Sequence, residues 1–418
     1  MAKVKTIIFI HQNFPAQFKH LAPLLAKNKN YNVHSISLID ESSEGVIHHK
    51  YSLEQTTSGT VHPLAQEFEA KIIRANSLSK LAYKMKSEGI MADLIIGHPG
   101  WGETLFIKNV WPDSKLLSYM EFFYYSKNSD VDFDSEFPND ESFLANKLTA
   151  RNAPILSDLY NADKIITPTN FQASHAPEYF KKKLVVLHEG IATNRLQRND
   201  NLRIQINEHV LTSNDKIVLF IARNLEPYRG YHSFIRSIPG VLKKHPDSYI
   251  SIVGGHDVSY GKQPPKGQSF KEIFQNEVRE SISDKKLRDL FDERVLFLGY
   301  LEYESLVKMI QISTLHVYLT YPFVLSWSFL ESMSCESIII ASNTEPVREV
   351  INDKKNGLLV DFFNYEEISE NIINILDDRE KFKHLGKNAR DFIIKNYDLE
   401  KVILPKYLKL IKDLLDEK

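Results

Sequence analysis

Short, continuously apolar runs alternate with helix-forming segments along almost the whole chain. Examples of these runs lie at 6–11, 92–97, 216–221 and 337–341. Strands that are buried on both faces of a parallel sheet have this pattern, whereas strands with one face in solvent alternate apolar and polar residues. Strands that alternate with helices form βαβ units, so the sequence predicts an α/β protein built on parallel sheets.

The alternation restarts in the middle of the chain. A polar stretch without clear periodicity, 193–214, separates the two series of runs. Such stretches are typical of domain boundaries, and a chain of 418 residues is long enough for two cores. We expect a doubly wound, Rossmann-like domain over 1–195, a second over 196–395, and a C-terminal helix over 396–418. The two sheets are predicted to face each other across a central cleft.

Charge and cysteine content exclude several classes of protein. The formal net charge is -2, whereas nucleic-acid-binding proteins usually carry a strongly basic face. The single cysteine, Cys335, cannot form an internal disulfide, and its apolar surroundings indicate a core residue in a reducing compartment. No apolar stretch approaches the roughly 18 residues of a membrane span. We therefore expect a cytoplasmic protein that binds no nucleic acid.

One stretch in the second half is suited to binding a phosphate group. The run 315–319 predicts a buried strand, Pro322 ends it, and Ser326 or Ser328 is placed to cap a helix. The first turn of a helix presents unpaired backbone N–H groups and a partial positive charge, and Glu331 beside it could accept hydrogen bonds from sugar hydroxyls. An ordinary connection between a strand and a helix explains the stretch equally well.

Polar side chains also follow three predicted strands of the first half. His11, His98 and Glu121 each lie at or just beyond the end of an apolar run. Because the loops after the carboxyl ends of parallel strands line the ligand crevice of a doubly wound sheet, we expect these side chains to converge. A lone histidine after a strand is as often structural as functional, and both interpretations stay open for His98.

Four segments, taken in order, resemble the GT-B glycosyltransferases of family 4, which are retaining nucleotide-sugar enzymes. They are the turn after the first strand, 188–191 (His-Glu-Gly-Ile), 222–230 (Ala-Arg to Arg-Gly) and 323–333. The resemblance covers nearly the whole chain. It implies the GT-B fold, a C-terminal helix that crosses back to the first domain, and transfer of a sugar from a nucleoside diphosphate to an acceptor hydroxyl.

The resemblance also implies which residues hold the donor. Arg223 and Arg229 would neutralise its diphosphate, and two surface arginines flanking a turn are the plainer alternative. Glu331 would bind the ribose hydroxyls, and Gly299 with Tyr300 would contact the base. The other expected donor-binding residues lie in two loops, with Leu325, Ser326, Trp327 and Ser328 before the predicted helix, and Asn13, Pro15, Ala16 and Gln17 after the first strand.

At two positions the sequence departs from the family pattern. Phe323 stands where the family has the first of two glutamates, the one usually assigned to the donor sugar. Glu121 stands where the family often has a histidine near the reacting carbon, and His98 is the nearest histidine. We expect Arg223, Arg229, Glu121 and His98 to be catalytic. Either another group, with Glu121 and His98 as the candidates, supplies the function of the missing glutamate, or the donor is held differently.

The resemblance implies no cofactor besides the nucleotide sugar, with a UDP-sugar favoured over a GDP-sugar, and no catalytic metal. The segment 130–134 (Asp-Val-Asp-Phe-Asp) resembles the metal-binding Asp-x-Asp of the other large glycosyltransferase fold. We interpret it instead as a solvated or acceptor-facing loop. The acceptor is expected to be a glycan, a lipid-linked molecule or a protein, in the synthesis of a glycan or cell-surface polysaccharide.

Three points stay open at this stage. The basic run 181–183 is compatible with a peripheral contact to the inner face of the membrane, although such runs are more often solvated. The oligomeric state is undetermined. Two further functions compete with the transferase: a catalytically silent nucleotide-sugar-binding subunit, suggested by Phe323, and a GT-B sugar-nucleotide epimerase.

Overall fold

The computed structural model describes residues 4–417, the side chain of Glu141 excepted, and these residues form two compact units. Unit 1 comprises the described residues up to Ser129, Asn139–Glu189 and those from Ile403 onward. Unit 2 comprises Asp130–Pro138 and Gly190–Val402. The chain passes from unit 1 to unit 2 after 189 and back after 402, and the sequence did not predict that 130–138 belongs to unit 2.

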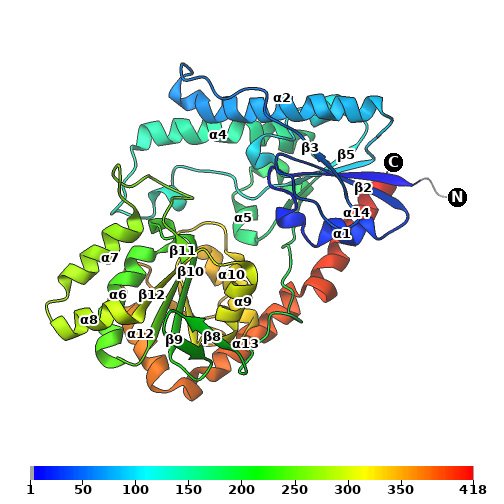
Figure 1. Ribbon diagram of the computed structural model, residues 1–418. Coiled ribbons are helices and arrows are strands. Elements are labelled where there is room, and N and C mark those ends of the chain that lie inside the picture. The colour runs from blue at the N-terminus through cyan, green and yellow to red at the C-terminus, as the bar shows by residue number, and fades with distance from the viewer. Residues whose placement is uncertain (1–3, 418) are drawn as a thin grey trace. The chain divides into compact units, whose positions relative to one another are not determined.

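Unit 1 is built on a seven-stranded parallel sheet with the order β3-β2-β1-β4-β5-β6-β7 (Figure 1). Its apolar runs are buried as predicted, since Ile7, Ile8 and Ile96 are fully inaccessible to solvent. The strand order reverses between β1 and β4, which is where doubly wound sheets bind ligands. The strands are β1 (Lys5–Ile10), β2 (Tyr31–Ser37), β3 (Ile47–Lys50), β4 (Leu94–Gly97), β5 (Lys115–Tyr119), β6 (Lys164–Thr167) and β7 (Leu184–Val186).

The helices of unit 1 include the C-terminal helix of the chain. Helices α2 and α4 lie side by side (Figure 1). The Tyr407 hydroxyl of α14 lies 3.5 Å from the Leu187 carbonyl oxygen, so the predicted return of the C-terminal helix to the first domain is confirmed. The helices are α1 (Leu21–Ala26), α2 (Gln66–Ser87), α3 (Ile107–Val110), α4 (Glu141–Asn161), α5 (Asn170–Ser174) and α14 (Leu404–Asp416).

Unit 2 contains a six-stranded parallel sheet with the order β12-β11-β10-β13-β14-β15. Its strand order reverses between β10 and β13. The two predicted doubly wound sheets are therefore both present. The strands are β10 (Ile217–Asn224), β11 (Tyr249–Gly255), β12 (Val295–Gly299), β13 (Leu315–Tyr318), β14 (Ile338–Ser342) and β15 (Leu358–Val360).

The helices of unit 2 follow its strands, as expected for βα repeats. They are α6 (Tyr231–Lys244), α7 (Phe270–Ser281), α8 (Lys285–Arg294), α9 (Tyr303–Ile312), α10 (Trp327–Ser334), α11 (Glu345–Arg348), α12 (Tyr365–Asp377) and α13 (Arg379–Tyr397). The polar stretch 193–214 is not wholly irregular, because it contains an antiparallel hairpin of β8 (Arg203–Ile206) and β9 (His209–Thr212). Ile204, Ile206 and Leu211 of this hairpin pack on a small apolar cluster, an alternating pattern too short to stand out in the sequence.

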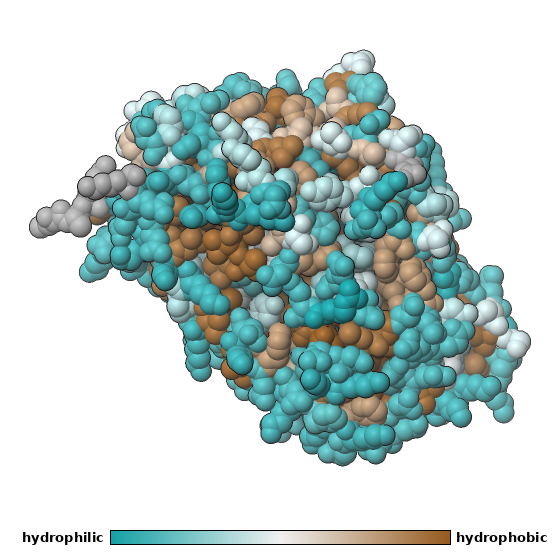
Figure 2. Space-filling view, turned by 180° about the vertical axis from the view of Figure 1, so that it is seen from behind, coloured by the Kyte–Doolittle hydropathy of each residue, from teal (hydrophilic) through white to brown (hydrophobic). Residues whose placement is uncertain are grey.

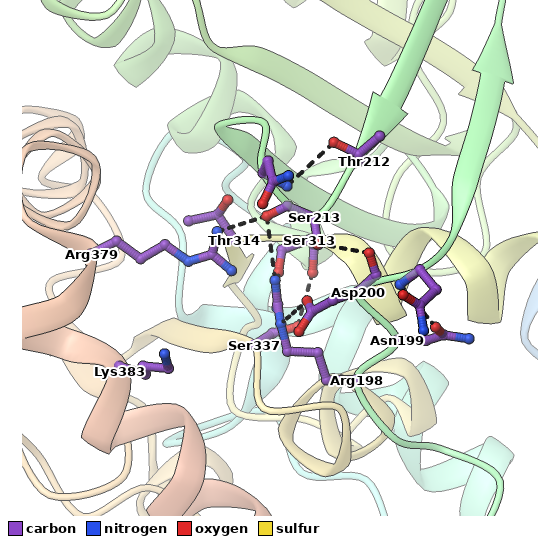
Figure 3. Close-up of polar contacts among 12 residues, drawn as sticks. Arg198, Asn199, Asp200, Thr212, Ser213, Ser313, Thr314, Ser337, Arg379 and Lys383 are labelled. Atoms are coloured by element: carbon purple, nitrogen blue, oxygen red, sulfur yellow. Dashed lines mark hydrogen bonds and ion pairs between the residues drawn. The ribbon is translucent and has the colours of Figure 1, made fainter.

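A polar network ties the segment after the domain boundary to the rest of unit 2 (Figure 3). The Arg198 guanidinium donates to Asp200 Oδ1 at 2.8 Å and to the Ser313 carbonyl oxygen at 3.1 Å. Arg379 donates to the Ser213 carbonyl oxygen at 2.8 Å. These carbonyls lie just before β10 and β13, at the amino edge of the sheet, so the arginines fasten the segment on the side away from the predicted ligand site.

Residues 4–417 include no helix that could cross a membrane. Seen from behind, the molecule is largely hydrophilic with local hydrophobic patches (Figure 2). None of the helices described combines the length and the apolar composition that a bilayer crossing requires. Cys335 is fully buried in the core of unit 2, as predicted, and burial raises the pKa of its thiol to about 12.

Candidate functional site

The predicted strand–turn–helix stretch has the expected form. Strand β13 ends at Tyr318, and Ser326 is the N-cap residue of α10. The Ser326 backbone N–H donates to the Tyr318 hydroxyl at 2.9 Å, while the Ser326 and Ser328 hydroxyls lie 2.8 Å apart. The Ser326 side chain makes no capping hydrogen bond to the first turn of α10. The partial positive charge at this helix start faces the carboxyl edge of the sheet, where an anion would be favoured.

Glu331 lies one turn into α10 and is only 4% exposed. The Tyr303 hydroxyl donates to Glu331 Oε1 at 2.7 Å, and the Arg195 guanidinium lies 5.4 Å from the Tyr303 ring centre. Burial, together with the Glu331 carboxylate, raises the pKa of Tyr303. Tyr303 thus orients the Glu331 carboxylate, the group that the family resemblance assigns to the ribose hydroxyls. Sequence reasoning missed Tyr303 because it begins a separate helix, α9, outside any motif.

Arg229 is buried and bonded to the loop that follows β13. Its Nη1 donates to the Tyr318 hydroxyl at 3.2 Å, to Thr320 Oγ1 at 2.9 Å and to the Val324 carbonyl oxygen at 2.9 Å. The Arg229 side chain is therefore fixed by three oxygens from one neighbouring segment. It joins the turn at Pro227–Arg229 to the stretch that leads into α10.

Four aromatic residues pack on one another beside this arginine, and two of them lie over its guanidinium. We call the four the aromatic cage: Tyr228, Tyr260, Tyr321 and Phe323. The guanidinium carbon lies 5.4 Å from the Tyr260 ring centre and 5.9 Å from that of Phe323, distances typical of cation–π contacts. The ring centres of Tyr260 and Phe323 are 4.9 Å apart. Phe323, at the position of the missing glutamate, is only 3% exposed. It packs on Arg229 instead of presenting a polar group.

The two predicted phosphate-binding arginines have different surroundings. Arg223 is exposed near the end of β10 and makes no hydrogen bond or ion pair with the described residues. Arg229, in contrast, is 8% exposed and donates hydrogen bonds to Tyr318, Thr320 and Val324. Arg223 therefore retains all its hydrogen-bond donors for a ligand, whereas Arg229 shapes the loop around the site.

Glu226, between the two arginines, was missed by sequence reasoning. Its carboxylate is fully buried and accepts from the Tyr260 backbone N–H at 2.9 Å and from the Ser259 backbone N–H at 3.1 Å. Burial raises the pKa of Glu226 to about 7, although both N–H groups oppose the shift. The residue connects the loop after β10 to the loop after β11. An acidic residue placed between two arginines was the available signal.

Glu226 predicts a specific dependence of stability on pH. Because its pKa is raised from 4.5 to about 7 in the folded protein, folding favours the protonated carboxyl. Its contribution to the free energy of unfolding is full below about pH 4.5 and is lost as the pH rises through 7, by up to about 3 kcal/mol. In Glu226→Gln, which stays neutral and keeps an acceptor oxygen, this loss should vanish. Urea unfolding of both proteins between pH 4.5 and 8 measures the difference, and parallel pH profiles would contradict it.

Gly299 is the last residue of β12, and Tyr300 follows it. The Tyr300 ring is 62% exposed, and its hydroxyl donates to Asn224 Oδ1 at 2.5 Å. Gly299 has a φ of +63°, a left-handed conformation that favours glycine. Asn224 in turn donates to the Ser259 hydroxyl at 2.8 Å. The ends of β10, β11 and β12 are therefore connected through side chains.

In unit 1, His11, His98 and Glu121 lie together, as predicted. The His11 and His98 ring centres are 5.2 Å apart, and His98 Nε2 lies 3.8 Å from Glu121 Oε2. Tyr119 stacks on His98 with ring centres 5.5 Å apart. The two histidines are 4% and 3% exposed. The carboxyl edge of the unit 1 sheet thus carries two buried imidazoles beside a carboxylate.

Backbone groups fix the proton position on both imidazoles. The Asn13 N–H donates to His11 Nδ1 at 2.9 Å, and the Gly100 N–H donates to His98 Nδ1 at 3.1 Å. A nitrogen that accepts carries no proton, so each neutral ring holds its proton on Nε2. Burial lowers the pKa of His11 to about 4 and that of His98 well below 6.5. His98 Nε2 is buried without a hydrogen-bond partner in the described structure, whereas the His11 ring lies beside the Gln17 side chain.

These two rings are suited to donating hydrogen bonds, not to removing protons. A neutral imidazole whose Nδ1 is already occupied can present only an N–H to a ligand. The hydrogen-bond acceptor for such a donor is a hydroxyl, carbonyl or carboxylate oxygen. Glu121, half-buried beside His98, is the ionisable group of the three that can accept a proton.

The loop after β1 forms a tight turn. Residues Ala16–Phe18 make a short helical turn that follows Pro15, and the Phe14–Pro15 peptide bond is cis. Asn13 is exposed, and Ala16 has a φ of +39°. The Gln17 Oε1 atom is buried without a hydrogen-bond partner among the described residues. The predicted loop is present, and its Gln17 side chain lies beside His11.

The segment 130–134 is not fully solvated, contrary to our expectation, because only Asp132 of its three acidic residues is exposed. Asp130 and Asp134 are 3% and 6% exposed, because both pack into unit 2. The Tyr228 hydroxyl donates to Asp130 Oδ2 at 2.8 Å, and the Tyr321 hydroxyl donates to Asp134 Oδ2 at 2.6 Å. Within residues 4–417, no three His, Cys, Asp or Glu side chains group as metal ligands would.

Two family models match the chain. One, described as the glycosyl transferase family 4 group, covers residues 25–196, and the other, described as glycosyl transferases group 1, covers residues 203–392. An uncharacterized glycosyltransferase of Methanocaldococcus jannaschii is 24% identical over 289 residues, 68% of this chain and 66% of that protein. The spore coat protein SA of Bacillus subtilis is 23% identical over 279 residues, 63% of this chain and 68% of that protein. The chain thus spans about two thirds of the length of these relatives.

Solved structures share the fold over nearly the full chain. The sucrose-phosphate synthase of Thermosynechococcus elongatus superposes with a TM-score of 0.74 at 18% identity, covering 98% of this chain and 99% of that one. The Anabaena protein HepE, solved in complex with UDP and glucose, has a TM-score of 0.68 at 13% identity, with 98% and 100% covered. At these identities the likeness establishes the fold.

Proposed function

Because the chain belongs to the glycosyl transferases group 1 family and has the GT-B fold, we propose that it is a retaining glycosyltransferase that moves a sugar from a nucleoside diphosphate to an acceptor hydroxyl. One observation carries the proposal. The start of α10, the buried Glu331 and the Arg229-bonded loop all lie at the carboxyl edge of the unit 2 sheet. This edge, at a reversal of strand order, is where such sheets bind nucleotides.

We propose a UDP-sugar as the donor, in preference to a GDP-sugar. The Anabaena neighbour was solved with UDP-glucose, which supports a uridine nucleotide for this fold. In the proposed complex, Glu331 accepts hydrogen bonds from the ribose hydroxyls. The exposed Tyr300 ring contacts the base, and Arg223 with the start of α10 holds the diphosphate.

The chemistry of the proposed reaction follows from these groups. Negative charge develops on the diphosphate as its bond to the sugar breaks, and a guanidinium group with a helix N-terminus stabilises that charge. A departing phosphate oxygen can take the proton of the acceptor hydroxyl, so no strong base is required. In unit 1, the Nε2–H groups of His11 and His98 would donate to sugar oxygens, and Glu121 would orient a hydroxyl.

We further propose that the acceptor is a glycan, a lipid-linked molecule or a protein hydroxyl, with cell-surface polysaccharide as the first candidate. Cytoplasmic action, with peripheral contact to the inner membrane face, belongs to the same proposal. A panel of lipid-linked and free glycan acceptors, each offered with the bound donor, would identify the acceptor class by the product that forms.

The first experiment is a thermal-shift screen of nucleoside diphosphates and their sugars. A ligand that binds only the folded protein at 100 times its Kd stabilises it by about 2.7 kcal/mol. UDP and at least one UDP-sugar should raise the melting temperature more than GDP. The absence of a shift with every nucleotide would contradict the proposal.

One observation favours a second candidate, a catalytically silent nucleotide-sugar-binding subunit. Phe323 stands at the position of the family's first glutamate and is buried against Arg229. Nucleotide binding without turnover over a broad donor and acceptor screen, together with co-purification of an active transferase, would support the silent subunit. Turnover of a bound donor would exclude it, and release of a changed nucleotide sugar without an acceptor would identify an epimerase.

The histidine geometry gives a prediction that separates hydrogen-bond donation from base catalysis. In His98→Gln the amide can still donate a hydrogen bond, whereas in His98→Leu it cannot. We expect the leucine variant to lose about 10- to 100-fold in kcat/KM, as for one lost hydrogen bond to substrate, and the glutamine variant to keep most of the activity. Equal losses in both variants would contradict a donor role. No activity step should appear between pH 6 and 7 from His98, because burial holds its pKa well below 6.5.

A further inference from the structure

We call the short segment Asp130–Pro138 the arm. The residues on either side, up to Ser129 and from Asn139, belong to unit 1, whereas the arm belongs to unit 2. A segment that leaves its own domain to pack on another must be held by specific contacts there. The contacts of the arm concentrate on the aromatic cage.

Two carboxylates of the arm accept hydrogen bonds from cage tyrosines. The Tyr228 hydroxyl lies 2.8 Å from Asp130 Oδ2, and the Tyr321 hydroxyl lies 2.6 Å from Asp134 Oδ2. His232 Nε2 lies 3.2 Å from the same Asp134 oxygen. Hydrogen bonds to an ionised acceptor are stronger than those between neutral groups, and all of these atoms are buried. The arm thus fixes the direction of both tyrosine rings.

Aromatic packing adds to these hydrogen bonds. The Phe133 ring centre lies 5.1 Å from that of Tyr321, 5.2 Å from that of Phe362 and 5.2 Å from that of Phe363. These separations are typical of packed aromatic pairs. Phe133 therefore packs against Tyr321 and helps to hold its ring in place.

The two tyrosines lie on the two segments that Arg229 joins. Tyr228 precedes Arg229 in the turn after β10, and Tyr321 follows Thr320, whose hydroxyl accepts from Arg229 at 2.9 Å. The Tyr228 and Tyr321 ring centres are 4.5 Å apart, and the Tyr321 N–H donates to the Tyr228 carbonyl oxygen at 3.0 Å. A shift of either ring would move the loop that leads to the start of α10.

We propose that Asp130 and Asp134 of the arm are positioning residues for the nucleotide-sugar donor, acting through Tyr228 and Tyr321 on the loops around Arg229. This inference rests on the proposed function, because it assumes that a nucleoside diphosphate binds at the same sheet edge. It assigns the acidic motif at 130–134 a role in place of metal binding. The carboxylates set the shape of the donor site without touching the donor.

The arm also contains a matched control. Glu136 forms a forked pair with Arg236, with distances of 2.8 Å to each carboxylate oxygen, and Arg236 also bonds Glu277. This anchor holds the arm on α6 and α7 and involves no residue of the cage. Loss of the Glu136 pair should therefore loosen the arm's attachment without changing the orientation of the cage tyrosines.

The test uses the full chain and compares Tyr228→Phe, Tyr321→Phe and their double variant with Glu136→Gln. Each phenylalanine keeps the ring and removes only the hydroxyl that the arm holds. Calorimetric titration with UDP, or with GDP if it binds better, measures the Kd, and thermal unfolding reports stability in the same samples. We expect the double variant to raise the Kd about tenfold, and Glu136→Gln to leave it within twofold of the wild-type value. Asp134→Asn, which keeps an acceptor oxygen, should fall between the two.

The outcomes separate the two proposals. If the wild-type protein binds the nucleotide and the double variant binds it equally well, the arm has no positioning role and the proposed function stands. An equal loss of affinity in Glu136→Gln would also overturn the role, because it would show general loosening. If the wild-type protein binds no nucleoside diphosphate, the proposed function fails and the arm's role fails with it.

Discussion

Replacing Arg223 by alanine is expected to lower kcat about 100- to 1,000-fold, the loss typical of removing one donor to a developing negative charge. Arg223 is exposed near the end of β10 and makes no hydrogen bond or ion pair with the described residues. Its guanidinium is therefore available to a departing diphosphate, whereas Arg229 uses Nη1 for three protein oxygens. Steady-state kinetics at saturating donor would measure the effect, with the melting temperature unchanged.

Two further variants make this result specific. Arg223→Lys keeps a positive charge but loses the fork that matches phosphate oxygens, so it should recover only part of the activity. Arg279, on α7, is also an exposed arginine of unit 2 and is paired with Asp292 at 2.8 Å. Arg279→Ala should leave kcat unchanged. A kcat for Arg223→Ala within threefold of the wild-type value would remove this residue from the reaction.

Replacing Arg229 by alanine is expected to lower both activity and stability. The change leaves the Val324 carbonyl oxygen, the Thr320 hydroxyl and the Tyr318 hydroxyl without their common donor, and it removes the guanidinium that packs on Tyr260 and Phe323. Buried acceptors left unpaired cost about 1 to 3 kcal/mol each, of which rotating hydroxyls recover a part, so we expect about 3 kcal/mol. Urea unfolding measures the loss of stability.

The effect of Arg229→Ala on donor binding should exceed what unfolding explains. Where the protein is still folded, the loop before α10 loses its anchor, so the donor KM should rise together with a fall in kcat. Thr320→Val, which removes one of the three acceptors, should show a smaller change in the same direction. An Arg229→Ala variant with an unchanged free energy of unfolding and an unchanged donor KM would show that the three hydrogen bonds of Arg229 contribute to neither stability nor donor binding.

The two parallel sheets could be predicted because their signal is local and repeated. Runs such as 6–11 and 216–221 are apolar on both faces, and this composition specifies a central parallel strand without knowledge of distant contacts. The helix start at Ser326, one of the two candidates, and the buried Glu331 followed from the same local patterns. The convergence of His11, His98 and Glu121 followed from a rule of topology.

The parts that sequence reasoning missed depend on contacts between distant segments. Asp130 and Asp134 look like solvated charges because their tyrosine partners are about a hundred or more residues away in the chain, at Tyr228 and Tyr321. From the sequence, Phe323 was only the position of a missing glutamate, whereas the structure shows its ring packed against Arg229 and two tyrosines. A pattern within one segment carries no information about such partners.

The most direct test of the central claim is proton NMR of the sugar released or transferred from an α-linked UDP-sugar that binds in the thermal-shift screen. In the absence of acceptor, slow transfer to water reports the stereochemistry through the first anomer formed, before mutarotation. Retention predicts that the α-anomer appears first, and that Arg223→Ala slows its appearance by the factor seen in kcat. First formation of the β-anomer would contradict a retaining enzyme, and bound donor that is never consumed would contradict a transferase.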